Sequence, residues 1–413
     1  MSRTSARHRY FFKLVLFLIL ALTFEALSWV AIAALAGSPL DFRSIRERHA
    51  DMQHQVRALI DAEGRSLVQL DPELGWIYAS NYRGKLYSSN SRGLRGKREY
   101  STSPPPGVLR VAAFGDSFVH ANEVADEESW SARLEKLEPR MEVLNFGVGG
   151  FGTDQALLYF ERRAREFDPR LVVLGFSEVD YGRNLNRFRR FRTATGLPQS
   201  KPRFRISDRA DGVLELLPNP FPDVDSLREL LGNPNAIFRA SEHDWFFEPV
   251  EWHNPLYNYL ASVRLLSTAG AWAWRSRLHP GRLYRSGKMN AESEGFRLLV
   301  RLVDRFARVA EADGRQFVFM IFPGNDSDIW GPGRPVYQPL LDELSGRHEV
   351  LDLRAALRQD RRVTPANLRK PGRHYGVEAN LTVAHALHRL AIDRGWLLSS
   401  YVVPLNARLH SNH

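Results

Sequence analysis

The sequence predicts an α/β domain built on a parallel sheet of five strands. Three short apolar runs, each followed by a turn and a helical pattern, begin the sheet at residues 109–114, 141–144 and 171–176. After a long interruption the pattern resumes with strands at 316–322 and 349–353 and helices near 293–312 and 337–344. Strands that alternate with helices in this way are typical of parallel sheets.

A serine follows the first of these strands, in the turn Gly115-Asp116-Ser117. Functional sites of open α/β sheets lie at the carboxyl ends of the strands. A serine there acts as a nucleophile when a base takes its proton and backbone donors hold the oxyanion. Asp116 is expected to order the turn by accepting backbone N–H groups. The tripeptide alone is also an ordinary turn sequence.

Two later blocks supply the other parts of such a site. The loop 145–153 contains four glycines, which let backbone N–H groups approach a ligand, so it is a candidate oxyanion hole. His374 precedes a helical pattern with apolar residues at positions 381, 384, 387 and 391. His374 is therefore a candidate general base at the start of the last helix.

The Gly-Asp-Ser turn, the Asn-x-Gly-x-x-Gly loop and the late histidine, in this order, resemble the SGNH/GDSL hydrolase superfamily over roughly residues 75 to 400. The block 90–96 before the prolines 104–106 resembles membrane-anchored bacterial members in particular. The resemblance implies a flavodoxin-like three-layer α/β/α sandwich that hydrolyses or transfers acyl esters. It implies that Ser117 is the nucleophile, that His374 is the base, and that the N–H groups of Gly150 and Ser117 hold the oxyanion.

One departure from the superfamily concerns the residues that follow the third strand, which we call the third block. An asparagine side chain normally donates to the oxyanion there, but this chain has Val179 in the stretch 178–180. Loss of one such donor typically costs ~10²–10³ in rate. Asp180 and Asn184 are the nearby polar residues expected to support the site, Asn184 as a replacement donor.

The second departure concerns the acid that orients the histidine. The superfamily usually has an aspartate two or three residues before the histidine, whereas this chain has Pro371 and Gly372. The sequence therefore predicts a Ser117–His374 dyad. A backbone carbonyl, Glu378 or Asp352 are the alternatives for accepting the other imidazole N–H.

Residues 14–36 form an apolar segment long enough to cross a ~30 Å hydrocarbon core as a helix at ~1.5 Å per residue. Basic residues precede it, so residues 1–13 are expected in the cytoplasm and the rest in the periplasm or another extracytoplasmic space. The prediction is a single-pass membrane anchor. A cleaved export signal is the alternative, because Glu25 is costly in lipid and Ala34-Leu35-Ala36 resembles a cleavage site.

The remaining chain divides into a stalk and lead-in segment at 37–105 and a hydrolase domain at 106–400. An insertion at about 183–290 interrupts the βα pattern and is rich in proline, arginine and aromatic residues. Its aromatic side chains form either a lid or sugar platform over the site, or a small core of the insertion itself.

The net charge of +10 is concentrated in two arginine-rich segments, at 183–209 and 358–373. They are expected either to bind an anionic glycan or phosphate group, or to form solvated basic faces. Nucleic acid is not expected as a partner, since no recognition motif is present. The absence of cysteine excludes thiol redox chemistry, and without a phosphate loop or zinc helix no cofactor or metal is predicted.

The sequence thus predicts an ester hydrolase or O-acyltransferase of SGNH type. It would act on acyl esters, acetyl above all, of an envelope or exported polysaccharide through a Ser-His acyl-enzyme mechanism. The alternative is a weak or inactive protein of the same fold that binds glycan or assists polysaccharide assembly. Activation of Ser117 separates the two hypotheses.

Overall fold

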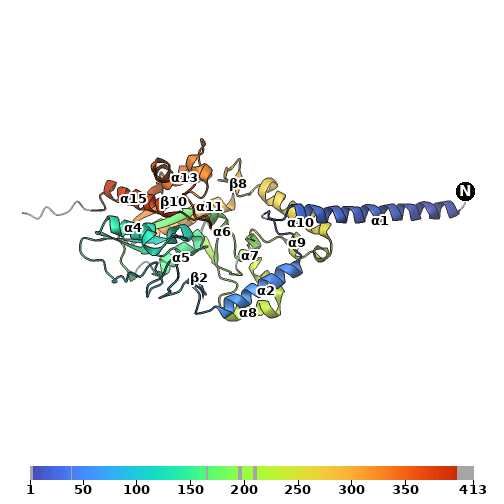
Figure 1. Ribbon diagram of the computed structural model, residues 1–413, viewed down its shortest axis with the longest axis horizontal. Helices are drawn as coiled ribbons and strands as arrows, with labels where there is room; N and C mark the ends of the chain where they lie inside the picture. The colour runs from blue at the N-terminus through green and yellow to red at the C-terminus, as the bar shows by residue number, and fades with distance from the viewer. Residues whose placement is uncertain (1–2, 39, 164–165, 194–197, 208–211, 398–413) are drawn as a thin grey trace, which may run out of the picture. The chain divides into compact units, whose positions relative to one another are not determined.

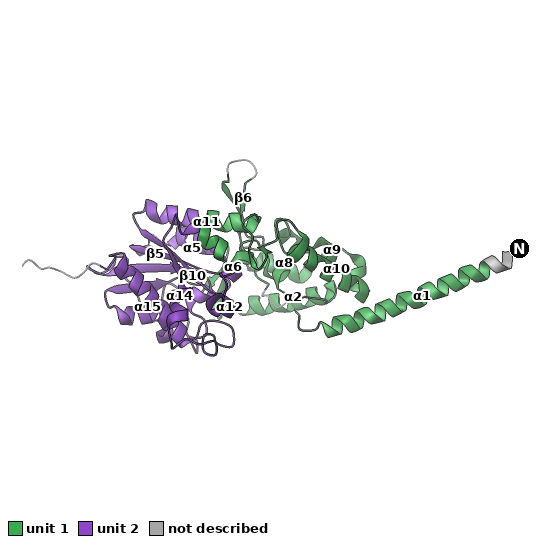
Figure 2. Cartoon of the chain, turned by 90° about the horizontal axis from the view of Figure 1, so that it is seen from above, with its two compact units in different colours: residues 1–79, 181–302, 336–342 green, residues 80–180, 303–335, 343–413 purple. Residues whose placement is uncertain are grey.

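The computed structural model describes residues 3–38, 40–163, 166–193, 198–207 and 212–397. The chain divides into two compact units (Figure 2). Unit 1 comprises residues 1–79, 181–302 and 336–342, and unit 2 comprises residues 80–180, 303–335 and 343–413. The insertion expected at about 183–290 thus belongs to a unit that also includes most of the predicted lead-in, while residues 80–105 belong to unit 2.

Unit 2 contains the predicted sheet of five strands, labelled in part in Figure 1. Its spatial order is β11-β10-β5-β3-β4, and every neighbouring pair is parallel. Counted along the chain this is the order 2-1-3-4-5 of flavodoxin-like folds, so the predicted fold class is confirmed. The strands are β3 (Leu109–Phe114), β4 (Met141–Asn145), β5 (Leu171–Ser177), β10 (Gln316–Phe322) and β11 (Val350–Asp352).

Helices cover both faces of this sheet, because alternate residues of each buried strand point to opposite sides. On one face Val111 and Val173 pack with Trp130 and Leu387 in a single apolar cluster. On the other face Phe114 stacks within an aromatic group that includes residues 146, 160 and 306. The helical segments of unit 2 are α3 (Ser117–His120), η1 (Asp126–Glu128), α4 (Trp130–Leu137), α5 (Thr153–Arg163), α12 (Asp326–Trp330), α14 (Leu353–Gln359) and α15 (Val377–Asp393).

Three helices contain a boundary between the units: α6 (Glu178–Arg183), α11 (Glu294–Ala312) and α13 (Gln338–Leu344). The last two match the helices predicted near 293–312 and 337–344. The strongly amphipathic pattern of α11 explains why its bounds were predictable within a residue.

Unit 1 has its own apolar core, which joins the lead-in to the insertion. Met52 and Val56 of α2 pack with Phe188, Phe221 and Leu227. Phe246, Phe247 and Trp252 pack against the same core, so several insertion aromatics serve the unit itself. The helix α2 is thus a packed part of unit 1, and a capping box of Ser44 and Glu47 begins it.

The elements of unit 1 are mostly short, apart from the N-terminal helix. They are α1 (Arg3–Ala34), α2 (Ile45–Asp61), β1 (Val68–Asp71), β2 (Gly75–Tyr78), α7 (Arg189–Arg192), β6 (Arg203–Ile206), β7 (Leu214–Leu217), α8 (Val224–Gly232), η3 (Pro234–Ala240), α9 (Pro249–Trp252), η4 (Pro255–Asn258), α10 (Ala261–Ala273), η5 (Trp274–Leu278), β8 (Tyr284–Arg285) and β9 (Lys288–Met289). The helix α1 contains a candidate membrane span, Arg7–Ala34, with a mean hydropathy of 2.3.

Candidate active site

Ser117 lies at the carboxyl end of β3, next to the point where the strand order reverses between β3 and β5. Asp116 caps the short helix α3, since its Oδ1 accepts the N–H of Phe118 at 2.8 Å, as the sequence predicts. Gly115 allows the sharp turn, because a Cβ there would lie 2.8 Å from the carbonyl oxygen of Gly175. The turn therefore presents Ser117 at the edge where α/β sheets carry their sites.

His374 reaches this serine from the other end of the sequence. Its Nε2 lies 2.9 Å from Ser117 Oγ, within hydrogen-bond distance. The histidine precedes α15, in a loop closed by the Lys370 N–H on the His374 carbonyl at 2.8 Å. The two residues that the sequence names as nucleophile and base are thus in direct contact.

The other imidazole nitrogen contacts a carboxylate that the sequence analysis did not single out. Glu123 Oε2 lies 2.8 Å from His374 Nδ1 and also accepts the His374 backbone N–H at 3.1 Å. Its second oxygen accepts the N–H of Gly372 at 2.7 Å. Ser117, His374 and Glu123 form a continuous hydrogen-bonded line, which we call the Ser-His-Glu line. The predicted dyad is therefore wrong.

The acceptors proposed from the sequence have other positions. Asp352 caps α14 by accepting the N–H of Arg354 at 3.0 Å, and Glu378 lies in the first turn of α15. Gly372, interpreted from the sequence as a missing aspartate, makes room for the Glu123 carboxylate. A Cβ at position 372 would lie 2.5 Å from the Glu123 carboxylate. The carboxylate that contacts His374 therefore comes from a different loop than the sequence analysis considered, and the glycine leaves room for it.

The environment keeps Glu123 ionised. Burial opposes its charge, but the hydrogen bonds from His374 and Gly372 outweigh this and lower the pKa of Glu123 below its ordinary value. A negative carboxylate holds the Nδ1–H tautomer of the imidazole, which leaves Nε2 free to accept the serine proton.

Arg95, from the block that resembles membrane-anchored members, ties down the loop that carries Glu123. Its guanidinium donates to the carbonyl of Val124 at 2.8 Å and contacts His120 Nδ1 at 3.1 Å. Burial and the charge of Arg95 lower the pKa of His120 well below its usual value, so this histidine stays neutral near pH 7. The strained backbone of Glu123, with φ of 69°, is thus held next to a buried guanidinium.

The glycine-rich loop after β4 packs against the serine turn. Val148 donates its N–H to the carbonyl of Gly115 at 3.0 Å, and a Cβ on Gly147 would overlap the backbone of His120. Asn145 ties the loop to α3 by donating to the carbonyl of Val119 at 2.7 Å. Gly150 follows with φ of 84° and is partly exposed, as a backbone donor to a ligand requires. Its oxyanion role remains a prediction.

In the third block, residues 178–180, an acidic side chain caps the start of helix α6, and no asparagine side chain is present to donate to an oxyanion. Asp180 is buried and accepts the N–H of Ser177 at 3.1 Å at the start of α6. Glu178 is also buried, and its carboxylate accepts the N–H of Gly324 at 3.0 Å. Asn184 is a fully buried residue of unit 1, and its proposed role as a donor remains a prediction.

The first arginine-rich segment supplies internal ion pairs to unit 1. Arg187, Arg190 and Arg203 are buried. Arg190 pairs with Asp51 at 2.7 Å, and Arg203 pairs with Glu294. This part of the segment is therefore not a solvated basic face. Arg209, which belongs to the same predicted cluster, lies outside the described residues.

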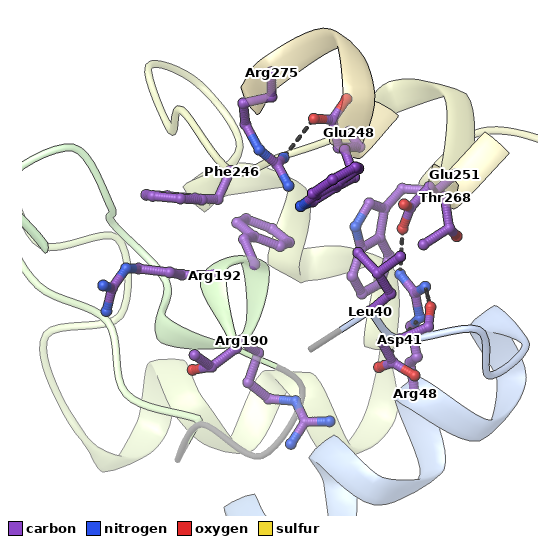
Figure 3. A pocket seen from close by; sticks show the side chains of 14 residues that line it. Leu40, Asp41, Arg48, Arg190, Arg192, Phe246, Glu248, Glu251, Thr268 and Arg275 are labelled. Carbon is purple, nitrogen blue, oxygen red and sulfur yellow. Dashed lines mark hydrogen bonds and ion pairs between the residues drawn. The ribbon is translucent and has the colours of Figure 1, made fainter. Parts of the chain in front are cut away.

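A pocket in unit 1 gathers arginine and aromatic side chains (Figure 3). Figure 3 shows Arg48 directed at Glu251, with 2.7 Å between Nη1 and Oε2, and Arg275 directed at Glu248. Carboxylates thus balance these cations, and the lining offers a free anion little net positive charge. In unit 2, Arg362 pairs with Asp360 at 2.7 Å, so the second segment is also partly neutralised.

No protein-family model and no curated protein matches this chain. Its structural neighbours include G-D-S-L lipolytic proteins from Desulfitobacterium hafniense (13% identity, TM-score 0.34, 68% of this chain and 99% of that chain) and Veillonella parvula (12%, 0.31, 68% and 97%). An acetyl-xylooligosaccharide esterase from Geobacillus is a third (12%, 0.24, 68% and 93%). The first two are described as members of the G-D-S-L family, and the third is described as an esterase. At such low similarity the function of this chain rests on its own site.

Proposed function

We propose that this protein is a serine ester hydrolase or acyltransferase in which Ser117 is the nucleophile, His374 the general base and Glu123 the orienting acid. The observation that carries the proposal is the Ser-His-Glu line, with 2.9 Å between Ser117 and His374 and 2.8 Å between His374 and Glu123. A nucleophile, a base and an orienting acid in series are the requirement for activating a hydroxyl at neutral pH.

In the first half of the reaction, Ser117 Oγ attacks the ester carbonyl carbon while His374 Nε2 takes the hydroxyl proton. The carbonyl electrons move onto oxygen, and the N–H groups of Ser117 and Gly150 hold that oxyanion. The C–O bond to the alcohol then breaks, and His374 returns the proton to the leaving oxygen. The ionised Glu123 stabilises the imidazolium between these two transfers.

In the second half, water or a sugar hydroxyl attacks the acyl-enzyme, with His374 again taking and returning one proton. Water gives hydrolysis and a sugar gives transfer, so both activities use the same residues. Val179 brings no side-chain donor to the oxyanion. We therefore expect a rate lower by about 10²–10³ than that of a site with a third donor.

For the substrate we propose acyl esters, acetyl above all, of an envelope or exported polysaccharide. The support is the membrane anchor proposed for α1, which would hold the site outside the cytoplasm. The basic residues Arg7, Arg9 and Lys13 precede the apolar segment 14–36 and favour a cytoplasmic N-terminus. Hydrogen bonds from α10 to Glu25 favour a retained anchor over a cleaved signal, since cleavage after Ala36 would remove Glu25. The intact mass of the protein from membranes tests this point.

The catalytic proposal is tested on the full chain in detergent with a fluorophosphonate probe and p-nitrophenyl acetate. The wild-type protein should react with the probe and hydrolyse p-nitrophenyl acetate, whereas Ser117→Ala and His374→Ala should do neither. Glu127→Gln should behave as the wild type does in both assays. Glu127 is an exposed carboxylate four residues after Glu123, so it is the matched control for substitutions in this loop. A folded wild-type protein that does not react with the probe would contradict the proposed catalysis and favour the glycan-binding alternative. Val179 supports that alternative, because it brings no side-chain donor to the oxyanion.

A further inference from the structure

Exposed apolar side chains are concentrated in one short part of unit 1. Outside α1, eight of the sixteen exposed large hydrophobic residues in the described part of the chain fall within residues 250–278. They lie in α10 and in the short segments just before and after it, and we call them the apolar surface of α10: Val250, Leu256, Tyr259, Leu260, Leu266, Trp272, Trp274 and Leu278. An apolar group of this kind on a folded unit marks an interaction surface.

Helix α10 has a second face that packs on protein. Its buried residues Ala261, Arg264, Thr268 and Ala271 recur every three or four positions, which is the spacing of one helical face. The exposed Leu266 is 60% accessible and does not belong to this face. One face of α10 is therefore buried against the rest of unit 1. Another face, which includes Leu266, is exposed in the described chain.

The start of α10 is fixed to the apolar span of α1. The Glu25 carboxylate accepts the backbone N–H groups of Ala261 and Ser262, the latter at 3.1 Å. One turn further along α1, Ser28 is buried, and Arg264 lies over the ring of Trp29 at 4.7 Å from its centroid. These contacts bring α10 alongside the C-terminal half of α1. They also satisfy a carboxylate that would otherwise be costly in lipid.

The position of Glu25 along α1 gives an estimate of how deep in the bilayer α10 contacts the proposed anchor. Glu25 follows Lys13 by 12 residues, which is about 18 Å along a helix at ~1.5 Å per residue. In a hydrocarbon core of about 30 Å, a helix with Lys13 near one boundary carries Glu25 past the midplane. The first turn of α10 then lies in the leaflet on the side of the folded units.

The chemistry of the apolar surface fits the boundary of that leaflet. Trp272 and Trp274 follow the apolar turns of α10, and tryptophan is enriched at the headgroup level of membranes. Arg277 lies over the Trp272 ring at 5.1 Å, which places a cation beside the aromatic group. Apolar residues next to tryptophan and arginine are typical of helices that lie in the membrane interface.

We infer that the apolar surface of α10 is embedded in the lipid leaflet next to α1, so that unit 1 is held on the membrane by two elements. The occupant of this surface is lipid, because α10 contacts the candidate membrane span of α1 and the surface carries aromatic and cationic residues. The inference rests on the anchor proposed for α1 and is independent of the proposed catalysis.

The absence of cysteine allows a direct test with single nitroxide labels on the full chain. The chain is reconstituted in vesicles of phosphatidylethanolamine and phosphatidylglycerol, and each label is relaxed by oxygen or by a water-soluble nickel complex. The two test sites are Leu266→Cys and Leu278→Cys. Leu18→Cys is the control for the anchor, and Val213→Cys, an exposed residue elsewhere in unit 1, is the control for water.

Oxygen should relax the labels at 266, 278 and 18 more than the nickel complex does, with the opposite order at 213. The inference is overturned when 266 and 278 resemble 213 while 18 remains in lipid. Labels at all four sites that prefer nickel would reject the anchor itself. Dipolar broadening between labels at 266 or 278, without a preference for oxygen, would show a second copy on this surface and would also overturn the inference. Thermal unfolding of each variant verifies its fold.

Discussion

Glu123, in the loop after α3, and Glu178, at the start of α6, are two carboxylates of unit 2 that are held in similar ways. Glu123 accepts the N–H of Gly372 at 2.7 Å, and Glu178 accepts the N–H of Gly324 at 3.0 Å. In both places a Cβ on the glycine would overlap the carboxylate. In each place, a glycine donates its backbone N–H to the carboxylate, and its lack of a side chain leaves room for that carboxylate.

The two carboxylates nevertheless differ in charge. Burial opposes the ionisation of each one. At Glu123 the hydrogen bonds from His374 prevail and lower the pKa. At Glu178 burial prevails, helped by the nearby Asp328, and raises the pKa to about 7. The comparison teaches that a single backbone donor does not fix the charge of a carboxylate, and that its neighbours decide it.

The largest effect is expected from exchanging each acid for its amide. Glu123→Gln should lower the rate of p-nitrophenyl acetate hydrolysis by about 10²–10⁴, because the amide does not hold the reactive imidazole tautomer. Glu178→Gln should leave the rate near that of wild type. Steady-state kinetics of both variants make the measurement. Equal losses in the two variants would contradict the separate roles of these carboxylates.

A smaller effect is expected from filling each glycine gap. Gly372→Ala should displace the Glu123 carboxylate and lower kcat by up to about 10², since misplacement by ~1 Å can cost that much. Gly324→Ala should displace Glu178 with little change in kcat. Single-turnover kinetics compare the two. An unchanged rate in Gly372→Ala would mean that Glu123 can shift without consequence for His374.

A still smaller effect is expected at the guanidinium that ties down the Glu123 loop. Arg95→Lys keeps the charge but loses the contacts of the planar fork with two carbonyls and His120. Loosening of the loop should lower kcat by roughly tenfold without raising KM, within the cost of a small misplacement. It should also move the acid limb of the pH–rate profile, because the Glu123–His374 contact weakens. A variant that is less stable but has the wild-type profile would assign Arg95 a structural role only.

The smallest effect is a change in how stability depends on pH. The folded pKa of Glu178 is raised from its ordinary 4.5 to about 7, so between these pH values the folded state binds more protons than the unfolded state. The free energy of unfolding should therefore fall as pH rises through this window, by roughly 2–4 kcal/mol for this group. Glu178→Gln should remove that contribution. Denaturant unfolding of wild type and variant at pH 5 and pH 8 gives the comparison, and parallel curves would contradict the raised pKa.

Much of unit 2 was predictable because its signals are local. Each strand of the sheet is mostly apolar, Ser117 stands three residues after a strand, and His374 stands three residues before a helix. Glu123 was missed because it contacts a histidine 251 residues away, and no spacing rule connects the two. Gly372 even suggested that His374 has no acidic partner, because a glycine stands where the superfamily usually has the aspartate.

Unit 1 was less predictable because its core joins segments that are distant in sequence. Met52 and Val56 stand in a polar stretch that looks like a stalk, and the aromatic residues that they pack with begin only at Phe188. The prediction of a small core within the insertion therefore identified the insertion's part of that core and missed the residues of the lead-in. The arginines of the insertion suggested an anionic ligand, whereas Arg190 meets Asp51 of the lead-in.

The contact between Glu25 and the start of α10 also has a consequence in time. Glu25 and Ala261 are 236 residues apart in sequence, so the donors that satisfy this carboxylate do not exist when α1 leaves the ribosome. At a synthesis rate of about 5–20 residues per second, they follow after roughly 12–47 seconds. In the proposed anchor, Glu25 would therefore stay without these donors until residue 261 has been made, and α1 would reach its final position in the membrane only after that.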